Sequence, residues 1–341
     1  MAMPIAVPRP ETWIRASSNG LYCEPGDFHI DPTRPVARAL ITHGHGDHAR
    51  AGNERVLATS GTIAIMQARY GELAGGSLQA VGYGETVTVG GVAVRLLPAG
   101  HVLGSAQIVL DYRGSRVVVS GDYKRRPDPT CLAFEPQRCD LFVTEATFAL
   151  PVFRHPPDSH EIDKLLHSVR LYPERCHLIG VYALGKCQRL LALLREAGYA
   201  EPVYLHRALL PLVELYRELG VDLGVVLPWS EAGREAFKGR IVLCPPAAIA
   251  DRWSRRLPDP VLALASGWMA VKQRAKARGV ELPLVISDHA DWDELSATLD
   301  EVGAPEVWVT HGREEALVHH ATQQGRRARA LSLIGFEEEE E

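Results

Sequence analysis

The chain has 341 residues, of which 46% are hydrophobic and 23% charged, a composition that excludes disorder as its main state and suffices for roughly two domains. Its formal net charge is −5, and the acidic run at 337–341 accounts for all of it, so the body lacks the global basic charge of many nucleic-acid-binding proteins. No run approaches the roughly 18 apolar residues of a membrane helix and the N-terminus lacks a signal-peptide pattern, so we expect a cytoplasmic protein without membrane contact.

Short β-branched runs separated by Gly, Pro and Asp predict a strand-rich first part of the chain. We expect a helix at 61–70 and strands at 36–42, 92–97, 106–111, 116–120 and 140–144. Polar residues stand where these strands end, which is where α/β proteins place their chemistry.

A second part begins near residue 158, where apolar residues at helical spacing alternate with short strands. The expected helices lie at 158–171, 185–197 and 207–219, and the expected strands at 176–182, 202–205 and 240–244. A strand at 261–266, a basic helix at 269–279 and strands at 282–287 and 305–310 follow. This alternation predicts a second, smaller α/β unit.

The most specific signal is the string HGHGDH at 43–48, directly after the first expected strand. His43 and His45 are two residues apart in an extended turn and point the same way, whereas Asp47 and His48 begin the next element and can face a second ion. Imidazole and carboxylate groups together suit zinc or manganese. A cysteine-type zinc site is not expected, because the six cysteines form no CxxC pair.

Further ligands must come from other strand ends, because one short motif cannot complete two metal sites. His101 follows the run VAVRLLP, Asp122 follows the run RVVVS, and His311 follows PEVWVT. The Asp122 carboxylate could bridge two ions. The chain has no GxxxxGK[ST] string, which excludes ATP hydrolysis by a phosphate-binding loop of that type.

In their order along the chain, these residues resemble the metallo-β-lactamase superfamily: an aspartate after a strand (Asp31), then HxHxDH, a lone histidine and a lone aspartate. The resemblance implies an α/β fold, the αββα sandwich. It extends to the β-CASP nucleases through Glu145 in LFVTEATF, His289 in VISDHADWDEL and His311 in WVTHGREEA. These three motifs separate the nucleases from lactamases and other hydrolases.

The resemblance also implies a domain order. A metallo-β-lactamase domain would be formed by two segments, 1–150 and 284–336, with a β-CASP domain at 151–283 inserted between them and an acidic tail at 337–341. The strings HIDP, ASGWM and SDHADWDEL make the chain most similar to the bacterial ligase-associated DNA damage response exonucleases.

Such a relationship implies a metal-dependent exonuclease in DNA repair, which hydrolyses phosphodiester bonds 5′ to 3′ and leaves 5′-phosphates. Its partner would be DNA that is single-stranded or has an end, with a functional link to a DNA ligase and a helicase. An RNA-processing nuclease is the alternative that His311 favours, because RNA-acting relatives carry His at this position and DNA-acting relatives of the Artemis type tend to carry Val. A small-molecule hydrolase, such as a thioesterase or lactonase, is a further alternative.

Carried over residue by residue, the resemblance assigns His43, His45 and His101 to one divalent ion and Asp47, His48 and His311 to the other, with Asp122 as the bridge. Asp31 would fix the tautomer of a ligand imidazole. The catalytic candidates are Asp47, His289 and Glu145; His289 would contact the scissile phosphate or protonate the leaving oxygen, and Glu145 would orient it. Contacts to the nucleic acid are expected from Lys124, Arg125, Lys186, Ser266, Lys272 and Arg274, and bases could stack on Trp229, Trp253 and Trp268.

Overall fold

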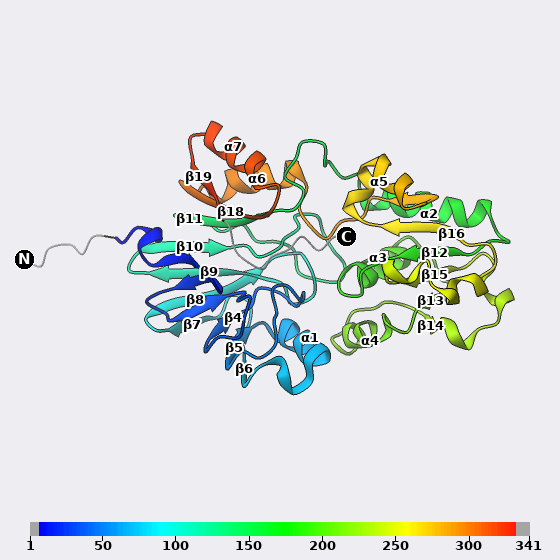
Figure 1. The fold of residues 1–341 in the computed structure, drawn as a ribbon, viewed down its shortest axis with the longest axis horizontal. Helices are drawn as coiled ribbons and strands as arrows, with labels where there is room; N and C mark the ends of the chain where they lie inside the picture. Colours follow the sequence, from blue (N-terminus) through cyan, green and yellow to red (C-terminus); the bar gives the residue numbers. More distant parts are fainter. Residues whose placement is uncertain (1–6, 332–341) are drawn as a thin grey trace, which may run out of the picture. The chain divides into compact units, whose positions relative to one another are not determined.

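The computed structural model describes residues 7–331, which divide into two compact units (Figure 1). Unit 1 comprises the described residues of Met1–Pro127, Cys131–Val152 and His289–Glu340, and unit 2 comprises Asp128–Thr130 and Phe153–Asp288. Most of unit 2 is therefore inserted into the sequence of unit 1. The acidic tail expected at 337–341 lies outside the described residues. No helix in the described part of the chain is both long and apolar enough to cross a membrane.

The first sheet of unit 1 has the strand order β1-β2-β3-β4-β5-β6. Its strands are β1 (Ile14–Ser17), β2 (Gly20–Cys23), β3 (Phe28–Ile30), β4 (Ala39–Leu40), β5 (Arg55–Ala58) and β6 (Ser77–Ala80). The pairs from β1 to β3 are antiparallel, and those from β3 to β6 are parallel. The strand expected at 36–42 is thus reduced to β4, because the chain turns out of the sheet to form the histidine-rich loop.

The second sheet of unit 1 has the order β19-β18-β11-β10-β9-β8-β7. Its strands are β7 (Thr86–Val89), β8 (Val92–Pro98), β9 (Ala106–Tyr112), β10 (Ser115–Val119), β11 (Leu141–Ala146), β18 (Glu306–Gly312) and β19 (Arg327–Ala330). Strands β7 to β10 pair antiparallel, whereas β10, β11, β18 and β19 pair parallel. The strands expected from 92 to 144 and at 305–310 are confirmed.

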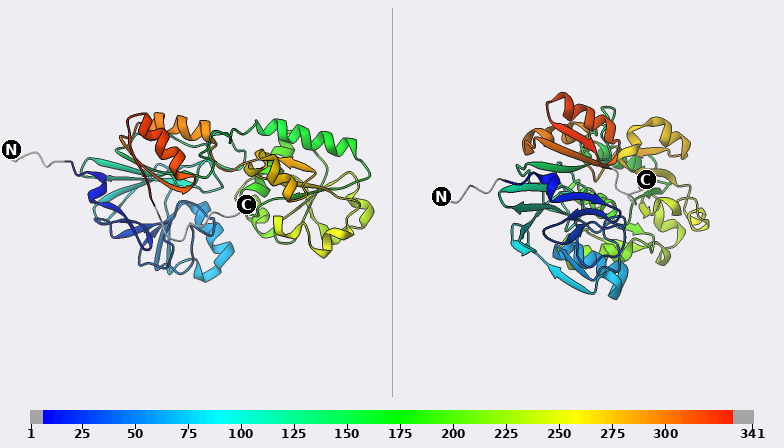
Figure 2. Two further views of the ribbon diagram at one scale, coloured as in Figure 1. Left: turned by 45° about the horizontal axis from the view of Figure 1, so that its top comes forward. Right: turned by 60° about the vertical axis from the view of Figure 1, so that its left-hand side comes forward.

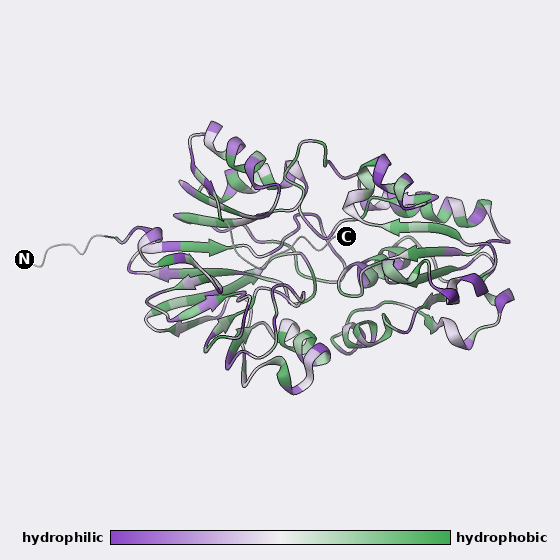
Figure 3. Ribbon diagram, viewed as in Figure 1, coloured by the Kyte–Doolittle hydropathy of each residue, from purple (hydrophilic) through white to green (hydrophobic). Residues whose placement is uncertain are grey.

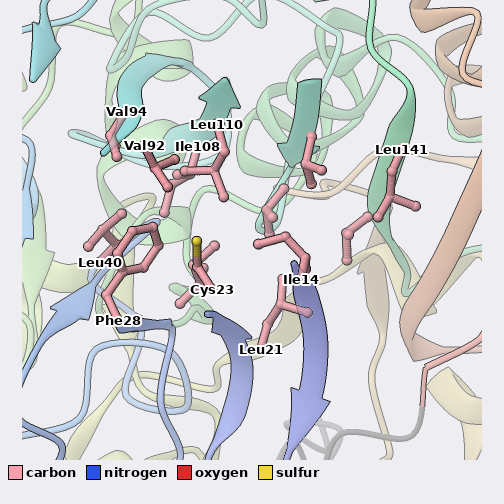
Figure 4. Close-up of a cluster of buried hydrophobic side chains, with 14 of the residues drawn as sticks. Ile14, Leu21, Cys23, Phe28, Leu40, Val92, Val94, Ile108, Leu110 and Leu141 are labelled. Atoms are coloured by element: carbon pink, nitrogen blue, oxygen red, sulfur yellow. The ribbon is translucent and has the colours of Figure 1, made fainter. Parts of the chain in front are cut away.

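Unit 1 is a four-layer sandwich. Apolar side chains of the two sheets meet in a buried core, part of which Figure 4 shows around Cys23, with Phe28 and Leu40 from the first sheet and Ile108 and Leu110 from the second. Helix α1 (Ser60–Tyr70) packs on the outer face of the first sheet. Helices α6 (Trp292–Val302) and α7 (Glu314–Gln323) cover the second (Figure 2). The expected αββα architecture is confirmed.

Unit 2 is built on a parallel sheet with the order β14-β13-β15-β12-β16-β17. The strands are β12 (His177–Gly180), β13 (Val203–Leu205), β14 (Val226–Pro228), β15 (Ile241–Cys244), β16 (Val261–Ala265) and β17 (Leu282–Leu284). The helices are α2 (Asp158–Leu171), α3 (Lys186–Glu196), α4 (Leu210–Glu218) and α5 (Lys272–Ala277). Strands such as β15 are short, wholly buried apolar runs, as expected for a parallel sheet, and β16 is hydrophobic in Figure 3.

The basic helix expected at 269–279 is shorter in the structure. The Ser266 side chain accepts a hydrogen bond from the backbone N of Trp268 and begins a separate 3₁₀ turn at Gly267–Ala270. Val271 then has an extended backbone, with φ −93° and ψ 99°, which interrupts the helical path. Helix α5 therefore begins only at Lys272.

Arg189 is the centre of a buried ionic cluster in unit 2. Its side chain is 1% exposed. The guanidinium donates to the carboxylate of Asp158 and to the backbone carbonyl of Ser287, and it lies 3.4 Å from Asp288 Oδ1 and 3.6 Å from Asp128 Oδ2. Burial alone would lower the pKa of Arg189, but the three carboxylates raise it above its ordinary value. Since Asp128 and Asp288 are terminal residues of the two segments of unit 2, this cluster ties the ends of the insertion together.

We expect Arg189→Met to destabilise unit 2 by about 3–5 kcal/mol, because it leaves buried carboxylates without their cation. Urea unfolding followed by circular dichroism measures the change. Arg170→Met, on the exposed face of α2, is the control and should change stability by less than about 0.5 kcal/mol. Equal effects of the two substitutions would contradict a structural role for the cluster.

Candidate metal centre

The loop that follows β4 carries the first four candidate ligands. His43 and His48 are buried in it, whereas His45 and Asp47 are partly exposed. The backbone N of His48 donates to the carbonyl of His45 at 3.2 Å, which closes a tight turn. Arg69 of α1 donates from Nη1 to the carbonyl of Gly44 at 2.8 Å. These two hydrogen bonds stabilise the loop without a bound ligand.

Three other strands deliver the remaining candidates. His101 follows β8, Asp122 follows β10, and His311 lies near the end of β18. The backbone at Gly121 requires glycine, because its φ is +56° and an added Cβ would lie 2.6 Å from the Cβ of Thr42. This close approach brings Asp122 against the histidine loop.

Asp122 is the residue around which the candidates gather. Its Oδ2 lies 3.5 Å from His43 Nε2, 3.5 Å from His48 Nε2 and 3.8 Å from His101 Nε2. Three groups of potential ligand atoms, each within 4.8 Å of one another, contain it: His43, His45, His101 and Asp122; His48, Asp122 and His311; Asp122, Glu145 and His289. Asp47 adds a carboxylate oxygen 3.5 Å from His48 Nε2. Every residue proposed from the sequence as a ligand thus lies in this one region of unit 1.

The donor set fits a divalent cation. His43 Nε2 and Asp47 Oδ1 are buried and have no hydrogen-bond partner among the described residues, which is costly unless another group binds there. Burial lowers the pKa of His43 well below its ordinary value, and burial together with His48 lowers the pKa of His311 to about 3, so both imidazoles are neutral at pH 7. Neutral imidazoles are the form that binds metals. The cluster is therefore able to hold a divalent metal.

The carboxylates point to the same conclusion. Burial, with a contribution from the neighbouring carboxylate of Glu145, raises the pKa of Asp122 to about 7. A carboxylate whose pKa is raised by burial is stabilised in its charged form by a nearby cation. The burial of Asp122 therefore favours a positively charged ligand at this position.

Asp31 supports the loop from behind. Its two oxygens accept hydrogen bonds from the backbone N of Thr42 at 2.8 Å and from the Thr42 hydroxyl at 2.5 Å, and Oδ2 lies 2.8 Å from His48 Nδ1. Because a carboxylate only accepts, Nδ1 of His48 carries the proton and Nε2 faces Asp122. Asp31 has a φ of +43°, a conformation that costs free energy in a non-glycine residue and is typical of functional sites.

Glu145 and His289 form a second polar pair beside Asp122. His289 Nδ1 lies 3.1 Å and 3.0 Å from the two Glu145 oxygens, so its N–H donates to that carboxylate. Glu145 is 1% exposed and also accepts from the backbone N of Tyr123 at 2.7 Å. The His289 ring centroid lies 4.7 Å from that of His101. The pair therefore belongs to the same polar region as the candidate ligands.

The residues expected to contact nucleic acid are placed differently from one another. Lys124 and Lys186 are each 1% exposed, and Lys186 pairs with Asp288 at 3.7 Å, so these ammonium groups lie inside the protein. Arg125 is partly exposed and binds Glu301 at 2.8 Å. Buried Ser266 caps the turn before α5, and Lys272 and Arg274 are exposed on that helix, where the Arg274 guanidinium lies 4.0 Å from the ring centroid of Trp268.

Sequence reasoning did not identify several supporting residues. Thr42 links Asp31 to His43, whose Nδ1 is 3.0 Å from the threonine hydroxyl. The Ser105 hydroxyl accepts from the backbone N of His101 at 3.1 Å. The glycine directly before Asp122 is a sequence signal that the backbone approaches another segment closely at this point. The pairing of Ser105 with His101 has no such signal, because it depends on the turn between them.

Known proteins support the same family. The family profile described as the metallo-beta-lactamase superfamily matches residues 31–176. A probable DNA ligase of Opitutus terrae is 28% identical over 94% of this chain and 31% of its own length. The cleavage and polyadenylation specificity factor subunit 3-I of Arabidopsis thaliana is 30% identical over 89% of this chain and 55% of its own length.

Two further similarities are shorter or more distant. Endoribonuclease YSH1 of Kluyveromyces lactis is 32% identical over 35% of this chain and 16% of its own length. A solved structure of a protein of unknown function from Enterococcus faecalis V583 has a TM-score of 0.58 and 12% identity, and covers 80% of this chain and 74% of that one, which shows a shared fold. The chain spans between 16% and 55% of the length of the curated relatives named here.

We expect Asp122→Ala to retain little metal, because Asp122 belongs to every group of candidate ligands. Wild-type protein loaded with zinc or manganese should unfold at a higher temperature than after EDTA treatment, since a ligand at a hundredfold excess over its Kd stabilises by about 2.7 kcal/mol. Elemental analysis and thermal unfolding measure the two effects.

The control is Asp163→Ala, which removes an exposed carboxylate on α2 and should behave as wild type. Wild-type metal content in Asp122→Ala would contradict the assignment.

Proposed function

We propose that this chain, as a member of the metallo-β-lactamase superfamily and its β-CASP nucleases, is a metal-dependent exonuclease. Its proposed substrate is DNA. In this proposal it hydrolyses phosphodiester bonds from the 5′ end, leaves 5′-phosphates and acts in DNA repair. The observation that carries the proposal is the meeting of two histidine groups and the Glu145–His289 pair at a single carboxylate, Asp122.

Two divalent ions, zinc or manganese, would be held by the residues that surround Asp122. His43, His45 and His101 would bind one and Asp47, His48 and His311 the other, with Asp122 between them. When bound, such ions supply Lewis acidity, which activates water near neutral pH and offsets charge on phosphoryl oxygens. Asp31 contributes by holding His48 in the tautomer whose Nε2 faces Asp122.

His289 supplies the proton that the leaving group needs. Its Nδ1–H donates to Glu145, so the proton available for transfer is carried on Nε2. The negative charge of Glu145 stabilises the protonated imidazole and fixes its orientation. Water adds to phosphorus and releases a proton to solvent while the bond from phosphorus to the 3′ oxygen breaks. That oxygen takes the proton from His289, which solvent then protonates again. The phosphate remains on the 5′ oxygen of the next nucleotide.

DNA is the favoured substrate because of the probable DNA ligase of Opitutus terrae. Its similarity covers 94% of this chain but only 31% of the ligase, so a region like this chain occurs there within a protein named for joining DNA. This similarity is the reason to propose a functional link between the present chain and a DNA ligase. A link to a helicase that exposes single strands is part of the same proposal. Lys272 and Arg274, exposed on α5, are proposed contacts to the DNA backbone.

RNA is the second candidate substrate, and the named endoribonuclease relative favours it. YSH1 of Kluyveromyces lactis is 32% identical over its matched region. His311, which faces His48 with ring centroids 5.0 Å apart, is the residue by which the chain resembles RNA-acting proteins.

We expect protein loaded with manganese or zinc to shorten end-labelled single-stranded DNA from its 5′ end, with products that carry 5′-phosphates. Denaturing gels with 5′-labelled and 3′-labelled strands separate the two polarities, and EDTA should abolish cleavage. Matched RNA and duplex DNA are tested alongside, with His43→Ala as the inactive control. Faster cleavage of RNA than of DNA would replace the repair assignment by RNA processing, and cleavage of thioesters or lactones alone would replace both.

We expect His289→Ala to slow DNA cleavage by about 10²–10⁴-fold, because it removes the proton donor. The same variant should cleave bis(4-nitrophenyl) phosphate almost as fast as wild type, since 4-nitrophenolate leaves without protonation at neutral pH. Metal content must equal that of wild type. His160→Ala, an exposed histidine on α2, is the control. Equal losses on both substrates would contradict the acid role of His289.

A further inference from the structure

We propose that unit 2 carries a stacking platform for single-stranded DNA, formed by Trp229, Trp253 and His206 with four arginines around them. We call these residues the tryptophan patch; its arginines are Arg207, Arg252, Arg255 and Arg256. The inference rests on the proposed function and adds to it a DNA-binding surface that contains none of the residues of the candidate metal centre.

Flat side chains follow one another in the tryptophan patch. The ring centroids of Trp229 and Trp253 are 4.8 Å apart at an interplanar angle of 46°. The Arg256 guanidinium lies 5.3 Å from the Trp229 centroid, and the His206 ring lies 5.2 Å from that of Trp253. Both tryptophans are only partly buried. Nucleic-acid bases stack on surfaces of this kind, each with a gain of about 1–3 kcal/mol.

The two tryptophans are anchored on their inner side. They pack against the buried cluster that includes Phe237, Cys244 and Leu257. Trp253 also donates from Nε1 to the carbonyl of Ala248 at 2.9 Å. The rings are therefore held in place before a ligand arrives, which lowers the entropy cost of binding.

The charge of the patch suits a phosphate backbone. All four arginines are exposed, and none lies within ion-pair distance of a carboxylate in the described part of the chain. Other arginines of unit 2, such as Arg175 and Arg240, do form such pairs. The exposed acidic residues next to the patch in sequence are Glu231 and Asp251, so the four arginines outnumber these carboxylates. Unpaired guanidinium groups beside aromatic rings are the combination that single-strand-binding proteins use.

Topology explains why these residues meet. His206 and Arg207 follow β13, Trp229 follows β14, and the 3₁₀ turn Arg252–Arg256 lies beyond β15. These three strands are neighbours in the parallel sheet, so their carboxyl ends lie at one edge (Figure 1). The carboxyl edge is where open α/β sheets bind ligands.

A single strand fits the patch better than a duplex. Stacking needs bases that are unpaired, and the 3₁₀ turn Arg252–Arg256 is five residues long, too short to read a major groove as a recognition helix does. The patch therefore binds without sequence preference.

The test measures binding by the full-length protein in EDTA, which prevents cleavage, to a fluorescein-labelled oligothymidylate. Trp229→Leu keeps an apolar group against the core, and Arg255→Gln with Arg256→Gln removes two exposed charges while both tryptophans stay packed on the core. We expect Trp229→Leu to weaken binding about five- to hundredfold. The double arginine variant should reduce the slope of log affinity against log salt by about 0.7 for each phosphate that the protein no longer neutralises.

Tyr172→Ala is the matched control, because Tyr172 is an exposed ring with the Arg175 guanidinium 5.6 Å from its centroid, in the segment before β12 rather than after a strand. It should bind as wild type does. Circular dichroism establishes whether each variant is folded. If Trp229→Leu is misfolded, the salt dependence of the double arginine variant decides whether the patch binds DNA.

Unchanged affinity and salt slope in the folded patch variants would overturn the platform. Equal binding of an oligouridylate, weakened to the same degree by the same substitutions, would overturn its assignment to DNA. Hydrolysis of bis(4-nitrophenyl) phosphate by the metal-loaded variants separates the two proposals: retained hydrolysis with weakened DNA binding supports the platform, whereas absent hydrolysis in wild type counts against the proposed function alone.

Discussion

The parallel pairing of β11 with β18 is the constraint on which the candidate centre depends. Thr144 pairs with Val309 and Ala146 with Gly312, and the register shifts between Thr144 and Ala146, where Glu145 lies. Gly312 has a φ of +87°, and an added Cβ there would lie 2.4 Å from the carbonyl of Ala146. The two strands approach too closely for any other residue, and this approach brings His311 to the end of the sheet where Asp122 and Glu145 already lie.

Many of the buried polar side chains around the candidate centre form hydrogen bonds with one another, which offsets the cost of burying them. Asp31, Thr42 and His48 satisfy one another behind the loop, and Glu145 holds both a backbone amide and His289. Two buried atoms of candidate ligands, His43 Nε2 and Asp47 Oδ1, have no hydrogen-bond partner among the described residues. A cation bound there would compensate these two atoms, because a buried polar atom is costly to leave unpaired. In unit 2, by contrast, the buried guanidinium of Arg189 is paired with carboxylates of the protein itself.

The spacing of apolar residues along the sequence predicted those helices and strands that have a clear apolar face. The boundaries of α2 and the strands from β8 to β11 follow from apolar periodicity, and the histidine string predicted where candidate ligands gather. Strand β6, with the sequence SLQA and largely exposed residues, has no alternation to reveal it. Neither the burial of Lys186 nor the cluster around Arg189 could be predicted, because the partners, such as Asp288, are distant in sequence. Tertiary contacts decide whether a charge is exposed, and a single sequence does not state them.

The insertion of unit 2 also determines when the centre can be assembled during translation. The ribosome releases the histidine loop, Asp122 and Glu145 early, then all of Phe153–Asp288, and only afterwards His289 and His311. Strands β18 and β19 of the second sheet follow unit 2 in the sequence, so the nascent polypeptide lacks one edge of its sandwich until unit 2 has been synthesised. The candidate metal centre therefore cannot be complete on a growing chain until His311 has been synthesised.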